Sequence, residues 1–307
     1  LTACGSGTQT KNGKNIETKD ITYAYSKVSL PDMKGNPTRV YKLNGKVYVQ
    51  TEDWLSQTPV FRVYRLDDSY QQADLVYQME EDEQHGIVGG IIQFTEESIV
   101  YWRTTESNQK KEIIESDLTG KIHNETDVTD YFVENATLNS VCKSAQGNYL
   151  ILSAPQLMLV DEAGKKIAKV DVKGEVCGCT INREGELVVA VNEEQGVVAY
   201  MLNEKDGSLS SDVVMDSMTV GATSENALCN GDENYDYYLR GASRLYGYDS
   251  NSKRSIPLLD YTASAMQMTE SMYVVPVSAQ QALGIYDGAG SATLASYRRL
   301  KPSEIKE

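Results

Sequence analysis

The chain has 307 residues and a formal net charge of −15, and its aromatic residues are mostly Tyr, with 20 copies against three Phe and two Trp. The acidic balance argues against nucleic acid as a partner, because phosphate backbones require a basic surface. No apolar run approaches the length of a membrane-spanning helix, so we expect any membrane attachment to come from a lipid. The length allows one large domain or two ordinary ones.

The chain opens with Leu1-Thr2-Ala3-Cys4, three small or apolar residues before a cysteine, and a polar run follows. This pattern resembles the lipobox at which bacterial lipoprotein precursors are cleaved. The resemblance implies that a signal peptide is removed before Cys4 and that the Cys4 thiol carries a diacyl lipid. Two acyl chains give stable anchoring, whereas one binds a membrane only marginally. Residues 5–20 have almost nothing to bury, so we expect residues 1–20 to be the lipobox and a flexible tether.

From residue 21 onward, short runs of alternating apolar residues are separated by turns, and no stretch holds a helical stripe over three turns. This pattern predicts an all-β fold. A recurring unit ends an apolar strand in Asp or Asn, at intervals of 50, 44, 42, 46 and 38 residues. The residues at the strand ends are Asp67, Asp117, Asp161, Asn203, Asp249 and Asp287. Such side chains accept hydrogen bonds from their own turn, and a following Gly supplies positive φ.

Each unit also has a preceding strand after a tight polar turn, for example residues 46–50 after Asn44-Gly45. A four-strand unit repeated at about 44 residues predicts a β-propeller of six or seven four-stranded blades. We place the propeller at residues 21–300. Residues 21–30 either close the ring by pairing with the last blade or belong to a seventh blade. The alternative is a β-sandwich with hairpins of similar length.

Propeller topology places the connections from second to third strand, and from fourth to first strand, on one face. In this sequence these connections are the longer ones, and they carry acidic groups and aromatic rings. Long loops over a rigid scaffold commonly hold function, so we expect the binding face there. The candidate ligand-binding residues are Asp53, Trp54, Glu81, Glu83, Tyr131, Phe132 and Tyr261.

Trp54 lies beside Asp53 in one of these loops. An exposed indole next to carboxylates suits stacking on a sugar ring while the carboxylates accept hydroxyl hydrogen bonds. The alternative is that the Trp54 ring folds back over the blade edge. Trp102 lies within a strand and is predicted to pack between blades.

Four cysteines follow Cys4, and we expect either buried thiols or a bridge between neighbouring strands. They are Cys142, Cys177, Cys179 and Cys229. Their spacing is not that of a zinc or redox motif, and we predict no metal and no cofactor. The histidines are His85 and His123, and neither accompanies a nucleophile motif. We therefore predict no catalytic residues, with paired carboxylates acting on a glycan as the alternative.

Residues 301–307 form a charged tail or a linker to a further domain. The succession of lipobox, tether, propeller and charged exit resembles the first part of large surface lipoproteins of Gram-positive bacteria. In some of these a propeller-like region precedes the extracellular solute-binding domain of an ABC importer. The resemblance covers most of the chain in architecture, and Leu1–Cys4 is its one defined motif.

That resemblance implies an extracytoplasmic protein, anchored through Cys4 to the outer face of the cytoplasmic membrane, with an envelope protein or transporter as a partner. From the residues themselves we expect a non-catalytic module that binds a glycan, a peptide or a partner protein. A glycan-active hydrolase or lyase and an envelope scaffold are the alternatives.

Overall fold

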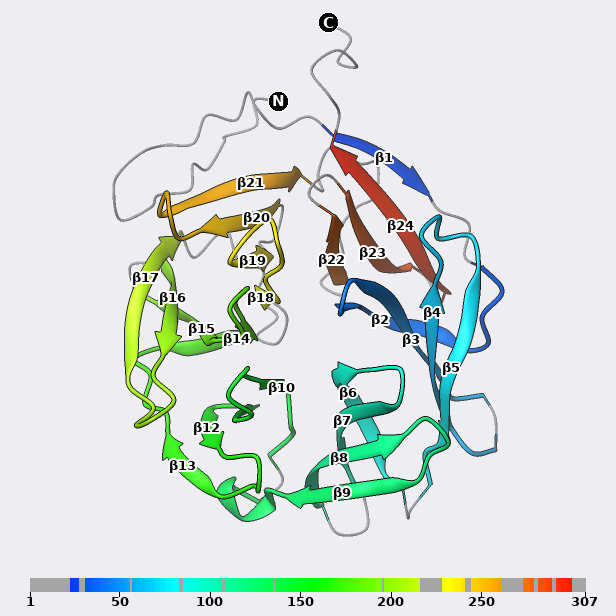
Figure 1. Cartoon of the computed structure of the whole chain (residues 1–307), viewed down its shortest axis with the longest axis horizontal. Helices are drawn as coiled ribbons and strands as arrows, with labels where there is room; N and C mark the ends of the chain where they lie inside the picture. The colour runs from blue at the N-terminus through cyan, green and yellow to red at the C-terminus, as the bar shows by residue number, and fades with distance from the viewer. Residues whose placement is uncertain are drawn as a thin grey trace, which may run out of the picture.

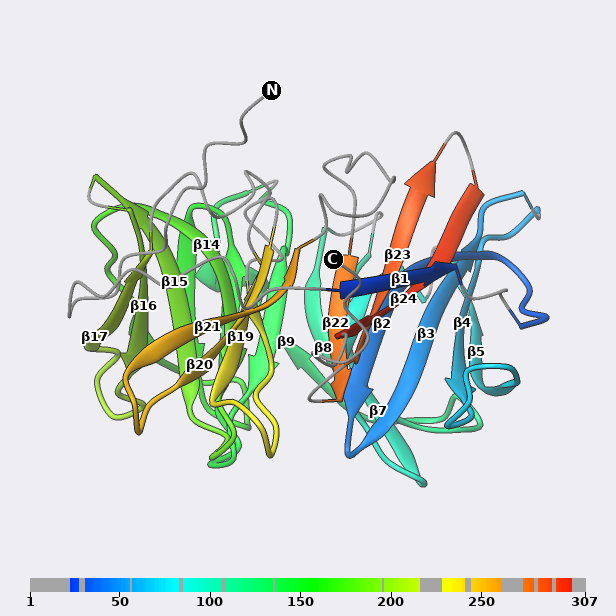
Figure 2. The ribbon, with the colours of Figure 1, turned by 90° about the horizontal axis from the view of Figure 1, so that it is seen from above.

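The structure is a computed structural model that describes residues 23–27, 31–55, 57–82, 85–105, 109–134, 136–194, 196–215, 228–240, 244–260, 273–278, 281–288 and 291–299. Within these residues the strands form six four-stranded antiparallel sheets. The sheets are arranged in a ring around one axis (Figure 1), and the side view separates the two faces of the ring (Figure 2). The prediction of an all-β propeller is confirmed, and the alternative of two sheets packed face to face is wrong.

We number the sheets in chain order and name each from its innermost strand outward. Sheet 1 contains β2 (Asn36–Leu43), β3 (Lys46–Asp53), β4 (Val60–Leu66) and β5 (Ala73–Glu80). Sheet 2 contains β6 (Ile87–Phe94), β7 (Ser98–Thr104), β8 (Lys111–Asp117) and β9 (Ile122–Asp127). Sheet 3 contains β10 (Ser140–Lys143), β11 (Tyr149–Ser153), β12 (Gln156–Val160) and β13 (Lys166–Lys169). A short 3-10 helix, η2 (Thr129–Tyr131), lies between sheets 2 and 3 in the chain.

The second half of the chain repeats the same order. Sheet 4 contains β14 (Glu175–Ile181), β15 (Leu187–Glu193), β16 (Gly196–Leu202) and β17 (Leu209–Met215). Sheet 5 contains β18 (Leu228–Cys229), β19 (Tyr237–Arg240), β20 (Arg244–Asp249) and β21 (Arg254–Asp260). Sheet 6 contains β22 (Tyr273–Ser278), β23 (Gln281–Gly288), β24 (Ser291–Arg299) and, from the other end of the described chain, β1 (Tyr23–Lys27).

Sheet 6 joins the two ends of the ring. Strand β1 pairs antiparallel with β24, with Tyr25 opposite Tyr297, which confirms that the first strand pairs with the last blade. This closure corrects the expected strand order, in which Asp287 ends a third strand: Asp287 lies in the second strand, β23, because β1 supplies the outermost position. The turn after Asp287 therefore joins second and third strands.

In the other five sheets the prediction of a third strand that ends in Asp or Asn is confirmed. Asp67 Oδ1 accepts hydrogen bonds from the backbone N–H groups of Gln71 and Gln72, both at 2.8 Å. Asp117 Oδ1 accepts from the Thr119 hydroxyl at 2.6 Å, and this bond, together with hydrogen bonds from the Lys121 and Thr119 N–H groups, lowers the pKa of Asp117 to about 2. Gly120 follows in that turn with φ of 92°. The side chain therefore closes each turn, as its position at a strand end predicts.

The apolar core is divided among the interfaces between neighbouring sheets. The interface of sheets 2 and 3, for example, buries Trp102 and Ile113 against Ile151 and Met158, which confirms that Trp102 packs between blades. A Cβ at Gly89 would lie 1.6 Å from the Trp102 ring, so that position requires glycine. Similar clusters lie between sheets 1 and 2, 3 and 4, 4 and 5, and 6 and 1, and they hold these neighbouring sheets together.

The start and the end of the chain lie outside the described residues, and with them lie Cys4, residues 5–20 and residues 301–307. Glu83 and Tyr261 also lie outside them. In the part of the chain that the structure describes, no helix is long and apolar enough to cross a membrane.

Candidate functional site

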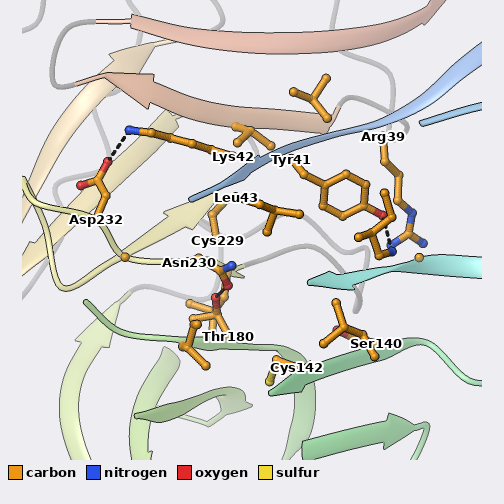
Figure 3. Close-up of a pocket in the computed structure, with 18 of the residues that line it drawn as sticks. Arg39, Tyr41, Lys42, Leu43, Ser140, Cys142, Thr180, Cys229, Asn230 and Asp232 are labelled. Carbon is orange, nitrogen blue, oxygen red and sulfur yellow. Dashed lines mark hydrogen bonds and ion pairs between the residues drawn. The ribbon is translucent and has the colours of Figure 1, made fainter. Parts of the chain in front are cut away.

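An axial channel runs between the innermost strands, with a volume of about 300 Å³. Residues from β2, β6, β10, β14, β18 and β22 line it, so every sheet contributes to its wall. Figure 3 shows ten of these residues labelled, among them Arg39, Lys42, Thr180 and Asp232. The wall is mixed in chemistry, with charged, hydroxyl, amide and thiol groups beside aliphatic ones.

The charged groups of the channel have partners among the described residues. Lys42 Nζ lies 3.4 Å from Asp232 Oδ2, which joins sheet 1 to sheet 5 across the ring. The Arg39 guanidinium lies over the Trp102 ring, 5.9 Å from its centroid. Thr180 Oγ1 donates to Asn230 Oδ1 at 2.8 Å. These contacts fix the innermost strands relative to one another.

A chain of hydrogen bonds leads from the channel wall toward the loop-rich face of sheet 1. The Ile91 N–H donates to Tyr41 Oη at 3.1 Å, and Tyr41 Oη donates to Gln50 Oε1 at 2.9 Å. Gln50 is fully buried, and its Nε2 donates to Glu52 Oε1 at 3.2 Å. The Trp54 side chain acts to lower the pKa of Glu52, against the stronger effect of burial. The chain of hydrogen bonds therefore ends at Glu52, close to the indole.

The Trp54 ring itself projects outward, with 51% of the residue exposed, and the neighbouring Leu55 is 95% exposed. Both follow directly on β3, which continues to Asp53. The Leu55 N–H donates to Asp53 Oδ1 at 3.2 Å, and Asp53 Oδ2 lies 3.7 Å from Arg62 Nη1. The loop tip is thus held at its base while its apolar side chains face solvent.

Glu81 is brought to the same place by the connection between β5 and β6. Its N–H donates to the Pro59 carbonyl at 2.8 Å, and its Oε1 accepts from the Val88 N–H at 2.8 Å. The side chain is buried, and this burial raises the pKa of Glu81 to about 7, with the charge of Glu52 acting in the same direction. Burial also raises the pKa of Glu52.

We call the group Glu52, Asp53, Trp54, Leu55 and Glu81 the Trp54 corner. Three of the predicted ligand-binding residues belong to it: Asp53, Trp54 and Glu81. Trp54 does not fold back over the blade edge, and Glu81, which the sequence predicted as a ligand-binding residue, is enclosed. The corner combines one fixed, half-exposed aromatic ring with carboxylates of different exposure.

The other predicted aromatic pair does not lie on an open surface. Phe132 is 9% exposed and belongs to the apolar cluster between sheets 2 and 3. Tyr131 packs against the same cluster; its hydroxyl donates to the Gly164 carbonyl at 2.8 Å and accepts from the Lys166 N–H at 3.2 Å. Both residues hold sheets 2 and 3 together, which corrects their expected place on the binding face.

Sequence reasoning missed Arg39, Tyr41, Gln50 and Glu52. A buried Gln at the end of an apolar strand was one available signal, because such a group requires hydrogen-bond partners. The other three gave no signal; Tyr41 and Arg39 meet Ile91 and Trp102 of sheet 2, and those contacts depend on the packing of neighbouring sheets. No group of three His, Cys, Asp or Glu side chains within metal-binding reach is found among the described residues.

Fold and channel together define an all-β propeller protein. No protein-family model matches the chain, and no curated protein matches it. Among solved structures, it is similar to an oligogalacturonate lyase in complex with manganese, with a TM-score of 0.53, 11% identity and coverage of 92% of this chain and 97% of that chain. It is also similar to a protein of unknown function from Bacteroides caccae, with a TM-score of 0.50, 14% identity and coverage of 77% and 86%. At these identities the likeness shows the fold alone.

Proposed function

We propose that this protein is a non-catalytic, lipid-anchored binding module of the outer face of the cytoplasmic membrane, and that it binds a glycan at the Trp54 corner. The observation that carries the glycan site is the half-exposed Trp54 ring, on a loop whose base is held by the contacts of Asp53 with the Leu55 N–H and Arg62. A sugar ring stacks its C–H groups on such an indole face. A ring that is already fixed loses little conformational entropy when the ligand binds.

The surrounding polar groups suit hydroxyls better than anions. Asp53 and Glu52 present carboxylate oxygens, which accept hydrogen bonds from sugar hydroxyl groups. The chain as a whole carries a net charge of −15, which disfavours an anionic ligand at an acidic corner. We therefore infer a neutral or cationic glycan as the ligand class.

A glycan array on the full chain tests this proposal, with a peptide array run beside it. Trp54→Ala should lose glycan binding, and Trp54→Phe should keep part of it, because a smaller ring still stacks. Leu75→Ala is the matched control, since Leu75 is 50% exposed on the outer strand β5. Equal glycan binding by Trp54→Ala and the unchanged protein would refute the site. Binding to the peptide array alone would show that the ligand is a peptide and not a glycan.

A second candidate function is glycan cleavage by Glu52 and Glu81. It is favoured by the pKa of Glu81 at about 7, which suits a general acid near neutral pH. The burial of Glu81 argues against it, because an enclosed carboxyl cannot reach a glycosidic oxygen without opening of the loop. Release of reducing ends or unsaturated products that Glu81→Gln abolishes would establish the enzyme and overturn the non-catalytic proposal.

The attachment and the partner are proposed from the lipobox and from the exposed loop tip. Mass spectrometry of the mature N-terminus in the native host should find a diacylated Cys4, and a free Cys4 thiol would refute the anchor. Leu55, at 95% exposed beside Trp54, also suits contact with an envelope protein or transporter, which is the scaffold alternative.

We infer that the ring closes with six blades, since β1 completes sheet 6.

A further inference from the structure

Two cysteines face each other across the interface of sheets 3 and 4. Cys142 lies on β10 and Cys179 on β14, the innermost strands of the two sheets, and both belong to the apolar cluster between them. The two strands lie side by side in the ring (Figure 1). The Cys142 thiol donates to the Leu150 carbonyl over 4.0 Å, and each of the two cysteines shifts the pKa of the other. Cys179 Sγ also lies 3.5 Å from Ser140 Oγ, to which its thiol donates.

Both residues also line the axial channel, and Figure 3 shows Cys142 and Ser140 in its wall. The channel has a volume of about 300 Å³, and its wall is the place where we expect a small reagent to meet the pair. Cys177 differs in this respect, because it belongs to the cluster between sheets 4 and 5 and donates to the Glu175 carbonyl. Cys229 lines the channel from β18, two sheets away from Cys142.

We propose that Cys142 and Cys179 form a disulfide across the interface of sheets 3 and 4, by exchange with small-molecule disulfides that enter the axial channel. The bridge is a modification site that joins two neighbouring sheets covalently. Its chemistry is thiol–disulfide exchange, in which a thiolate attacks a disulfide sulfur and displaces a thiolate.

The two thiols have different roles in this exchange. The Cys142 side chain lowers the pKa of Cys179, whereas the Cys179 side chain, together with burial, raises the pKa of Cys142. Ser140 Oγ lies 3.5 Å from Cys179 Sγ, so its hydroxyl can donate to a Cys179 thiolate, and we assign the first attack to Cys179. It forms a mixed disulfide with one half of the reagent, and the other half leaves as a thiol after taking up a proton.

Cys142 then completes the bridge. Its thiol loses a proton and attacks Cys179 Sγ, which breaks the mixed disulfide and releases the second half of the reagent as a thiol. One small-molecule disulfide is reduced to two thiols, and the protein loses two hydrogen atoms. The bridge constrains the unfolded chain between residues 142 and 179, so the oxidised protein should unfold at a higher temperature than the reduced protein.

The experiment uses the full chain with Cys4→Ser, so that four cysteines remain: Cys142, Cys177, Cys179 and Cys229. The folded protein is incubated with glutathione disulfide, denatured, alkylated without reduction and mapped by mass spectrometry of its peptides. We expect a cross-linked peptide that joins Cys142 to Cys179, with alkylated Cys177 and Cys229. Four alkylated thiols, or a bridge between another pair, would overturn the proposal.

Single substitutions then assign the roles. Cys177→Ser and Cys229→Ser are the matched controls and should keep the bridge. Cys142→Ser should accumulate one glutathione adduct on Cys179, and Cys179→Ser should accumulate adduct on Cys142 more slowly. Circular dichroism confirms that each variant is folded, and the mapping of the Cys4→Ser chain decides the main point even where a variant does not fold. A faster adduct on Cys142 would overturn the assignment of Cys179 as the attacking group.

Discussion

The Trp54 corner and the segment of Tyr131 and Phe132 look alike in sequence and differ in the fold. Both place aromatic rings beside acidic residues in long connections of the same predicted face. Trp54 is half-exposed, and the base of its loop is held by Asp53. Phe132 is buried between sheets 2 and 3, and the Tyr131 hydroxyl is bonded to backbone groups of sheet 3.

The difference shows that the type of connection determines whether its aromatic residues are buried or exposed. Trp54 lies in the hairpin loop between β3 and β4 of one sheet, where Trp54 and Leu55 are exposed. Tyr131 and Phe132 lie in a crossing from sheet 2 to sheet 3, which must cover the seam between the two sheets. Apolar rings in a crossing therefore become core, while those at a hairpin tip remain available for a ligand.

The largest expected effect is a loss of stability when the buried aromatic ring of this comparison, Phe132, is removed. Phe132→Ala should lower the free energy of unfolding by about 3–5 kcal/mol, because it leaves a cavity between sheets 2 and 3. Denaturant unfolding measures this loss. Glycan binding by the molecules that remain folded should be unchanged, and a destabilisation as small as that of an exposed site would contradict the core assignment.

A pH titration of stability sharpens the description of the Trp54 corner. The folded pKa of Glu81 is about 7, against an ordinary value of 4.5. The folded state therefore holds the Glu81 proton more tightly than the unfolded state does. The stability that Glu81 contributes is fully present below about pH 4.5 and is lost as the pH rises to about 7. The loss should reach up to about 3 kcal/mol, with Glu52 acting in the same direction.

Glu81→Gln should flatten this pH dependence, because the amide oxygen can keep the Val88 N–H bond without ionising. The exposed neighbour Glu80 supplies the control, and Glu80→Gln should leave the slope in place. Unfolding midpoints between pH 4 and pH 8 measure both variants. A slope that persists in Glu81→Gln would mean that another group titrates.

The next effect concerns affinity and not stability. Trp54→Ala should weaken glycan binding by about 2 kcal/mol, roughly 30-fold, as for an aromatic residue at the centre of a contact. Its free energy of unfolding should fall by no more than about 1 kcal/mol, since the ring is half-exposed. Calorimetric titration measures the affinity, and denaturant unfolding measures the stability. A large stability loss with unchanged affinity would show that Trp54 is a core residue and not a ligand contact.

The smallest effect tests the role of the Tyr131 hydroxyl. Tyr131→Phe removes its bonds to Gly164 and Lys166 and should cost about 1 kcal/mol of unfolding free energy. Glycan binding should stay at the level of the unchanged protein. Reduced binding without a change in stability would restore Tyr131 as a ligand-binding residue.

The sequence was sufficient for the fold class because the repeating signal is local. Asp67 and Asp117 close their own turns through hydrogen bonds within a few residues. The regular spacing of these strand ends is therefore visible in the sequence without knowledge of the fold. The order of strands in sheet 6 could not be read in the same way. There β1 takes the outer place by pairing with β24, and that pairing joins opposite ends of the chain.

The candidate site was predictable in part for the same reason. Asp53 and Trp54 are neighbours on one hairpin, and their loop position is visible in the sequence. The Tyr41–Gln50–Glu52 chain unites β2 and β3 and receives a donor from β6, so its existence depends on sheet pairing. Likewise, the burial of Glu81 depends on the way its connection packs against Pro59 and Val88.

The chain contains two Trp residues, which permits a direct test of the glycan site. A ¹H–¹⁵N correlation spectrum should contain two indole N–H signals, and Trp54→Phe assigns them. Addition of a glycan selected by the array should shift the Trp54 signal and leave that of the buried Trp102 unchanged. A shift of the Trp102 signal alone, or no shift at a glycan concentration that saturates binding, would contradict the Trp54 corner as the place where this protein meets its ligand.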